Sequence, residues 1–95
     1  MTKSSIENTV YDTGAQRDSR KNKLSFSLMP HAELIRVLKR YQEGADTYGR
    51  NNWIKGMTMS TYYDSAMRHI ISYWQGDTSE DHAAAAIWNI FAMMH

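Results

Sequence analysis

The chain has 95 residues, no cysteine and a formal net charge of +1 with its histidines neutral. The lack of cysteine excludes a disulfide framework and a zinc–thiolate site, and a nucleic-acid-binding protein would be expected to show a clearer basic excess. The hydrophobic content of 42% suits a packed domain rather than a disordered chain. A single domain of this length has a thin core, which association with other copies would complete.

No segment has the pattern of a secretion signal or a membrane anchor. Residues 1–11 are polar, and nowhere do about eighteen apolar residues follow one another. These patterns predict a cytoplasmic protein that does not span a membrane.

Residues 1–28 are predicted to form an irregular arm, because they are rich in small polar residues and show little periodicity. Within the arm, residues 23–28 alternate polar and apolar side chains, which is typical of a half-buried extended segment. We therefore expect Leu24, Phe26 and Leu28 to pack across the helices that follow.

Residues 29–95 are predicted to form a single helical domain, built from three antiparallel helices. The first helix is expected over about residues 31–48, because Pro30 suits a helix start and Gly49 suits the position just after a helix end. Its apolar residues recur every three or four positions, as a helix that packs on one face requires. They are Leu34, Val37, Leu38, Tyr41, Ala45 and Tyr48.

The second helix is expected over about residues 59–75, between a loop that contains Trp53 and the helix-stopping Gly76. Asp64 and Arg68 are four residues apart, so an ion pair on its outer face is expected. Its apolar stripe is predicted to face the core. The stripe comprises Tyr63, Ala66, Met67, Ile70 and Trp74.

The third helix is expected over about residues 79–94, after a capping box at residues 78–81. Apolar residues cover most of its circumference, and helices of that kind are buried. In so small a protein a second copy would complete this burial, so we expect a homo-oligomer with this helix near the interface. The apolar residues are Ala83, Ala84, Ile87, Trp88, Ile90, Phe91, Met93 and Met94.

A narrow line of small and polar residues interrupts the apolar surface of the third helix. His82, Ala85 and Asn89 fall on one side at 100° per residue, and we call them the polar seam. The seam either faces solvent or lets a ligand or another helix approach closely, and the sequence leaves both readings open. Asp81 precedes the seam, where a carboxylate also suits a helix cap. His69 falls at the border of the second helix's stripe, where a structural histidine is more common than a ligand.

Two acids on the first helix are candidate metal ligands. Glu43 and Asp46 are three residues apart and share a face, and paired carboxylates can hold Mg²⁺, although a solvated acidic edge is the more common explanation. The chain contains no Walker loop, no Gly-rich dinucleotide motif, no His-Glu-x-x-His and no nucleophile elbow. Any chemistry is therefore expected to be metal-assisted activation of water.

Three stretches occur in a fixed order along the chain. Residues 18–30 run from Asp through Lys and Leu to Pro, and residues 43–53 read Glu-Gly-Ala-Asp-Thr-Tyr-Gly-Arg-Asn-Asn-Trp. The third comprises residues 66–69, ending Arg-His, then Gly-Asp at 76–77 and a His-to-Asn run within 81–89. Together they resemble the small all-α domain of phage-associated dATP/dGTP diphosphohydrolases, which is similar to the MazG-like nucleotide pyrophosphohydrolases.

The resemblance implies a multimer, a divalent metal (Mg²⁺ or Mn²⁺) and cleavage of a purine deoxynucleoside triphosphate to monophosphate and pyrophosphate. Our hypothesis assigns three groups of residues to such a site. The catalytic group is Asp64, His69, Asp81 and His82. The nucleotide-binding group is Lys23, Arg50, Asn52, Trp53, Arg68 and Asn89. The metal-binding group is Glu43, Asp46 and Asp77.

The chain also departs from the pattern of that family. It shows no clean Glu-x-x-Glu followed by Glu-x-x-Asp, and it carries Ala85 where many members have a second histidine. The alternative is therefore a non-catalytic phage protein that sequesters a nucleotide or blocks a host defence protein. In either case a phage protein would act in the host cytoplasm.

Overall fold

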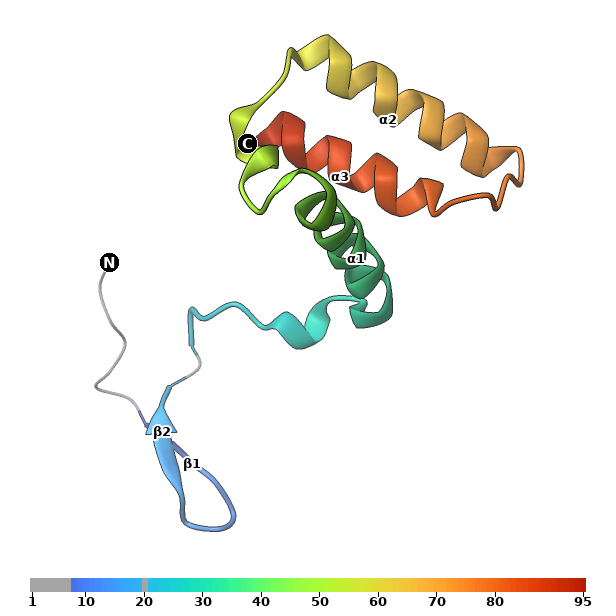
Figure 1. Cartoon of the computed structure of the whole chain (residues 1–95). Helices are drawn as coiled ribbons and strands as arrows, with labels where there is room; N and C mark the ends of the chain where they lie inside the picture. The colour runs from blue at the N-terminus through green and yellow to red at the C-terminus, as the bar shows by residue number, and fades with distance from the viewer. Residues whose placement is uncertain (1–7, 20) are drawn as a thin grey trace.

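The computed structural model describes residues 8–19 and 21–95. They form a small β-hairpin followed by three α-helices (Figure 1). The predicted all-α, three-helix fold with an irregular N-terminal region is confirmed. Part of the predicted arm, residues 1–7 and 20, lies outside the described residues. None of the helices in the described ranges is both long and apolar enough to cross a bilayer.

The helices are α1 (His31–Tyr48), α2 (Met59–Trp74) and α3 (His82–Met94). Figure 1 shows α2 and α3 side by side as an antiparallel hairpin, with α1 packed across α3. Short side chains let these helices approach closely. The buried apolar residues are Val37, Tyr62, Ala66, Ala84, Ala85 and Ala86.

The ends of α1 follow from its flanking residues. Pro30 is the N-cap rather than the first helical residue, and its carbonyl accepts the N–H of Leu34 at 3.0 Å. Gly49 follows the helix with φ +97°, a conformation that residues with a Cβ rarely adopt. The predicted helix at 31–48 is confirmed.

The start of α3 differs from the prediction. The helix begins at His82, three residues later than expected, because Asp81 is the N-cap and its carboxylate accepts the N–H of Ala84 at 3.1 Å. The capping box predicted at residues 78–81 is wrong. The residues before the cap form a turn instead, in which Asp77 accepts the N–H of Ser79 at 2.8 Å.

The apolar stripe predicted on α2 mostly faces outward. Ala66 is buried as predicted, but Tyr63, Met67, Ile70 and Trp74 are exposed. The inward face carries Tyr62 with the small or polar residues Ser65, Ala66 and His69. The polar inward face therefore lines a pocket, and the described residues leave most of the apolar stripe exposed.

Contrary to the prediction, the arm does not pack across the helices. Leu24, Phe26 and Leu28 are 89%, 77% and 85% exposed, and the last two lie in a 3₁₀ turn, η1 (Phe26–Leu28). A second departure from an irregular arm is the antiparallel pair β1 (Asn8–Val10) and β2 (Gln16–Asp18).

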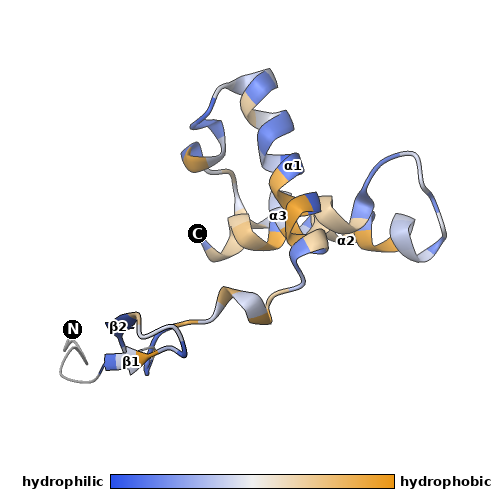
Figure 2. Ribbon diagram, turned by 90° about the horizontal axis from the view of Figure 1, so that it is seen from below, coloured by the Kyte–Doolittle hydropathy of each residue, from blue (hydrophilic) through white to orange (hydrophobic). Residues whose placement is uncertain are grey.

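The described chain is more extended than a compact domain of its size. Its radius of gyration is 19.0 Å, whereas a compact chain of this length has a value of about 12 Å. The arm projects away from the helices (Figure 1), and α3 is coloured mainly in hydrophobic tones while the second half of α1 is hydrophilic (Figure 2). The core of a single copy is therefore thin.

Candidate functional site

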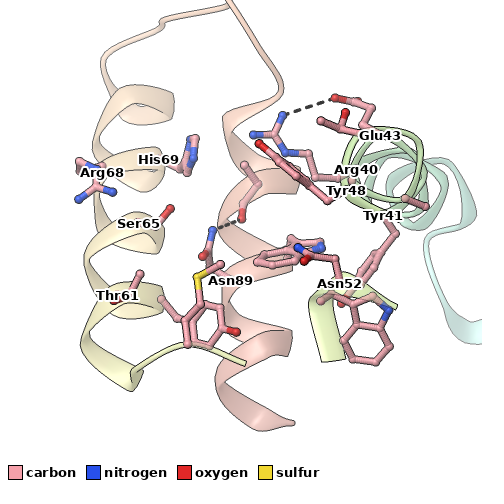
Figure 3. A pocket seen from close by; sticks show the side chains of 18 residues that line it. Arg40, Tyr41, Glu43, Tyr48, Asn52, Thr61, Ser65, Arg68, His69 and Asn89 are labelled. Atoms are coloured by element: carbon pink, nitrogen blue, oxygen red, sulfur yellow. Dashed lines mark hydrogen bonds and ion pairs between the residues drawn. The ribbon is translucent and has the colours of Figure 1, made fainter. Parts of the chain in front are cut away.

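A pocket of about 480 Å³ lies between α1 and α2, with α3 as its floor (Figure 3). This volume is within the range of small-molecule sites. The inward face of α2 contributes Ser65 and His69, and α3 contributes Ala85 and Asn89. The polar seam of α3 is therefore buried beneath this pocket and the α2 helix, and the reading in which it faces solvent is wrong.

Aromatic rings line one end of the pocket. Trp53 lies in the short 3₁₀ helix η2 (Asn52–Lys55), and its ring meets Tyr41 edge to face at a centroid distance of 5.8 Å. Tyr41 also contacts Trp88 of α3 at 5.9 Å, and Trp88 contacts Tyr62 of α2 at 6.2 Å. This aromatic end joins all three helices and presents flat apolar faces to a ligand.

The opposite end of the pocket is charged. Figure 3 shows Arg40 and Glu43 on α1 across from Arg68 and His69 on α2. The guanidinium of Arg40 is 3.9 Å from the carboxylate of Glu43 and donates to Glu80 at 3.1 Å. The pocket therefore combines an aromatic end with an end rich in cationic donors.

Asn89 is a polar group in the floor of the pocket. It is 7% exposed, and its amide nitrogen donates to the carbonyl of Ala85 at 2.8 Å. That bond fixes which end of the amide is nitrogen, so the amide oxygen is the acceptor that Asn89 can offer to a ligand.

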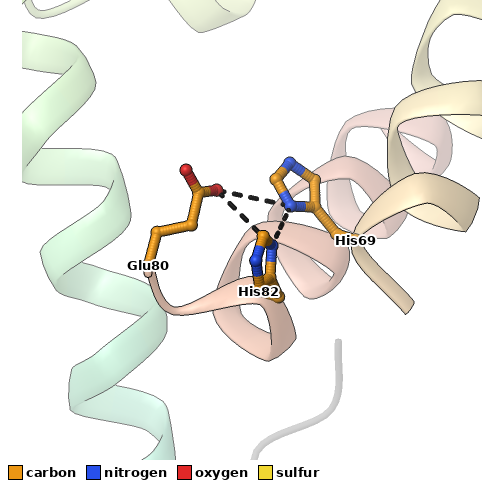
Figure 4. Close-up of side chains that lie close together, drawn as sticks. All are labelled: His69, Glu80 and His82. Carbon is orange, nitrogen blue, oxygen red and sulfur yellow. Dashed lines mark hydrogen bonds and ion pairs between the residues drawn. The ribbon is translucent and has the colours of Figure 1, made fainter. Parts of the chain in front are cut away.

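Two histidines and a glutamate meet where the charged end reaches the α2–α3 loop (Figure 4). The Nδ1 atoms of His69 and His82 are 2.8 Å apart, and Oε1 of Glu80 lies 3.4 Å and 3.7 Å from them. Partial burial lowers the pKa of His69, and the nearby Glu80 only partly opposes this shift. At neutral pH the His69 ring is therefore neutral.

A second pocket, of about 540 Å³, lies on the other side of this cluster. Its wall holds the carboxylate of Asp81, which accepts two hydrogen bonds from Arg36 of α1, both at 2.7 Å. These bonds lower the pKa of Asp81 to about 2. Asp77 also lines this pocket, and the Ser79 backbone N–H lowers its pKa as well.

Comparison with protein families decides the assignment of the chain. The family described as dATP/dGTP diphosphohydrolase, N-terminal, matches residues 13–95. The chain belongs to this family. No curated protein and no solved structure matches the chain.

Nine of the thirteen residues proposed for a diphosphohydrolase site line one or the other of the two pockets. The first pocket is lined by residues from all three predicted groups, whereas the second is lined by two of the predicted acids and His82. Those that line the first are Glu43, Asn52, Trp53, Arg68, His69 and Asn89. Those that line the second are Asp77, Asp81 and His82. The remaining four, Lys23, Asp46, Arg50 and Asp64, line neither pocket.

The three predicted metal ligands, Glu43, Asp46 and Asp77, do not form one cluster among the described residues. Glu43 pairs with Arg40, Asp46 accepts the side-chain amide of Gln42 at 2.9 Å, and Asp77 lies in the other pocket. Mg²⁺ requires a near-octahedral set of oxygen ligands. Among the described residues, the one group of three or more potential ligands contains two imidazoles, so it is not an oxygen-only set.

The sequence also predicted an ion pair between Asp64 and Arg68 on the outer face of α2. No ion pair joins Asp64 to Arg68 in the part of the chain that the structure describes, so the predicted pair is absent. Asp64 is exposed on α2, away from the pocket residues.

Several site residues were missed by sequence reasoning. Arg40 and Tyr41 line the pocket from α1, Glu80 completes the histidine cluster, and Arg36 holds Asp81. Spacing along α1 could have placed Arg36 and Arg40 on one face, one turn apart. No local pattern could have paired Glu80 with His69, because the α2–α3 loop brings them together.

Proposed function

We propose that the first pocket binds a purine deoxynucleoside triphosphate and that the protein is a pyrophosphohydrolase releasing the monophosphate and pyrophosphate. One observation carries the proposal: a single pocket joins an aromatic end to an end with two arginines and a histidine. A nucleotide has the same two parts, a flat base and an anionic phosphate chain.

The charged end is suited to the phosphates. Arg68 stands on the pocket rim, and Arg40 can exchange part of its contact with Glu43 and Glu80 for phosphate oxygens. Arginine presents several N–H donors in a planar fork that matches phosphate oxygens.

The aromatic end is suited to the base. Stacking on Trp53 or Tyr41 would hold any base, and the Asn89 amide oxygen would accept a hydrogen bond from an N–H of the base, such as the amino group of adenine or guanine. Glu43 is the carboxylate among the described pocket residues, and as a base it would polarise an attacking water.

The test is a product analysis on the full chain. The protein is incubated with the four deoxynucleoside triphosphates and Mg²⁺ or Mn²⁺, and the products are separated by ion-exchange chromatography. We expect dGTP or dATP to give the monophosphate and pyrophosphate, with dCTP and dTTP turned over more slowly. Nucleotides recovered intact in every reaction would rule out hydrolysis.

The same structure supports a second candidate, capture of the nucleotide without hydrolysis. The observation in its favour is that Glu43, Asp46 and Asp77 do not meet in one chain, which leaves no oxygen-only metal site among the described residues. A binder would retain dGTP or dATP unchanged and regardless of EDTA, which equilibrium dialysis followed by chromatography of the recovered ligand would detect.

We also propose that the protein acts as a homo-oligomer. The outer stripe of α2 and part of α3 expose apolar side chains that a second copy would cover. Burying this apolar surface would stabilise the assembly by about 25 cal/mol for each Å² removed from water. The exposed residues in question are Met59, Tyr63, Met67, Ile70 and Trp74 on α2, and Ile87, Ile90, Phe91 and Met94 on α3.

A further inference from the structure

The cluster of His69, His82 and Glu80 has the dimensions of a metal site. A tetrahedral ion with bonds of about 2.1 Å holds its ligand atoms roughly 3.4 Å apart. Oε1 of Glu80 already lies 3.4 Å and 3.7 Å from the two Nδ1 atoms. The 2.8 Å between the two nitrogens is a hydrogen-bond distance, so a modest outward turn of one ring would complete the geometry.

A second observation supports a metal site: the nitrogen of His82 that faces away from the cluster contacts a carboxylate. Nε2 of His82 lies 3.1 Å from Oδ2 of Asp77. An ionised carboxylate only accepts, so Nε2 of His82 carries a proton, and in the neutral imidazole Nδ1 then presents its lone pair to His69 and Glu80. A histidine that donates its far N–H to a carboxylate while its near nitrogen faces an ion is the usual arrangement at metal sites.

The proton positions in the cluster follow from that bond. Since Nδ1 of His82 is an acceptor, Nδ1 of neutral His69 is the donor in the 2.8 Å contact. For His69 to become a ligand, its proton moves from Nδ1 to Nε2 through solvent. The ring stays neutral in this exchange, so no proton is released and no other reactant is required.

We infer that His69, His82 and Glu80 bind a divalent transition-metal ion of the zinc class, at the junction of the two pockets. Two imidazole nitrogens and one carboxylate suit Zn²⁺, Co²⁺ or Ni²⁺, whereas Mg²⁺ prefers oxygen alone. The charges favour a cation: Glu80 and Asp77 are anionic and Arg40 offsets one of them, which leaves a negative charge at the cluster. Three protein ligands leave a coordination position open, next to a wall of the nucleotide pocket.

Metal titration of the full chain tests this inference without any nucleotide, so its result is independent of the proposed function. After removal of metals with EDTA and exchange into chelator-free buffer, Co²⁺ is added and its visible absorption is followed, and Zn²⁺ is then measured by competition with a coloured chelator. We expect one ion per chain, the intense absorption of a four-coordinate Co²⁺ site, and no displacement of Co²⁺ by equal Mg²⁺.

Variants separate this site from adventitious binding. Glu80→Gln and His69→Gln change partly exposed residues and should weaken Zn²⁺ binding at least about tenfold, while Asp77→Asn should weaken it by about 10- to 100-fold through His82. His31→Gln and Glu33→Gln replace exposed residues of the same types outside the cluster and should leave the affinity unchanged. Absence of Zn²⁺ binding, or equal affinity in the Glu80→Gln and His69→Gln variants with circular dichroism showing an unchanged fold, would overturn the inference.

Discussion

Asp81 performs two structural tasks with one carboxylate. It caps α3 through the N–H of Ala84 and receives two bonds from Arg36, which tie the start of α3 to α1. Because α1 contacts mainly α3, this pair matters for the position of α1 and hence for the wall of the first pocket. The capping role proposed from sequence is correct, and the ion pair adds a function that the sequence did not predict.

The shifted pKa of Asp81 predicts how stability depends on pH. Its pKa falls from 3.8 to about 2 on folding, so the folded state gains stability from this group above about pH 4 and loses it as the pH falls from 4 to 2. Asp81→Asn retains a capping oxygen but removes the charge. Urea unfolding should show wild type more stable than the variant at pH 7, with the difference vanishing near pH 2. A difference that persists at pH 2 would contradict this assignment.

Asp81→Ala removes the cap as well as the charge. We expect an additional loss of about 0.5–2 kcal/mol relative to Asp81→Asn at pH 7, measured by urea unfolding. Equal stability of the two variants would show that the bond to the Ala84 N–H contributes little.

Trp53 offers a test of the aromatic end of the pocket. If a base stacks on its ring, Trp53→Ala should weaken dGTP binding by about 1–3 kcal/mol, which isothermal titration calorimetry can measure. Trp53→Phe keeps a flat ring beside Tyr41 and serves as the matched control, with most of the affinity retained. An equal loss in both variants would indicate that Trp53 supports the fold of η2 rather than the base.

At the scale of elements, helix positions could be predicted but their orientations could not. Periodicity and the stops at Gly49 and Gly76 located all three helices to within about three residues. The outward stripe of α2 was assigned to the core because apolar periodicity shows that a helix has an apolar face, not what covers it. In the structure, small and polar residues such as Ser65 and His69 face α3 instead.

For the candidate site too, the sequence predicted some of the residues but not how the elements bring them together. His69 and His82 could be singled out from sequence, because both lie in stretches that resemble the family: His69 in the Arg-His pair and His82 in the His-to-Asn run. Glu80 and Arg40 could not, because their roles depend on how the α2–α3 loop and α1 meet. The predicted packing of residues 23–28 failed for a related reason: alternation predicts an apolar face, but a single copy of the chain provides no surface for it.

The alanine run of α3 predicts a strong sensitivity to side-chain size. Ala85 lies on the face of α3 that packs against α2, and its side chain is 1% exposed. Ala85→Leu would therefore force α2 away from α3 and lower the free energy of unfolding by about 1–3 kcal/mol. Thermal unfolding followed by circular dichroism would show a lower Tm. Ala83 is only partly buried, and Ala83→Leu is the control, with a small effect. An unchanged Tm for Ala85→Leu would show that the interface between α2 and α3 is looser than described.

For the whole molecule, the question is what covers its apolar surface. Among residues 8–19 and 21–95 no large side chain is fully buried, and Trp74 is 90% exposed. A soluble monomer rarely exposes apolar residues in a continuous stripe, and such stripes mark interaction surfaces. The arm adds the exposed side chains Leu24, Phe26 and Leu28, and its described part projects away from the helices (Figure 1).

We therefore expect size-exclusion chromatography with light scattering to give a mass above that of one chain at micromolar concentration. Met67 and Ile70 lie on the outer stripe of α2, so Met67→Glu or Ile70→Glu should shift the protein toward monomer, because a charge buried at an apolar interface is costly. Gln42→Glu places the same charge on an exposed polar face of α1 and should leave the mass unchanged. A monomeric wild type would mean that another partner covers the stripe. Oligomers that persist in both stripe variants would show that the interface is formed by the exposed residues of α3 or of the arm instead.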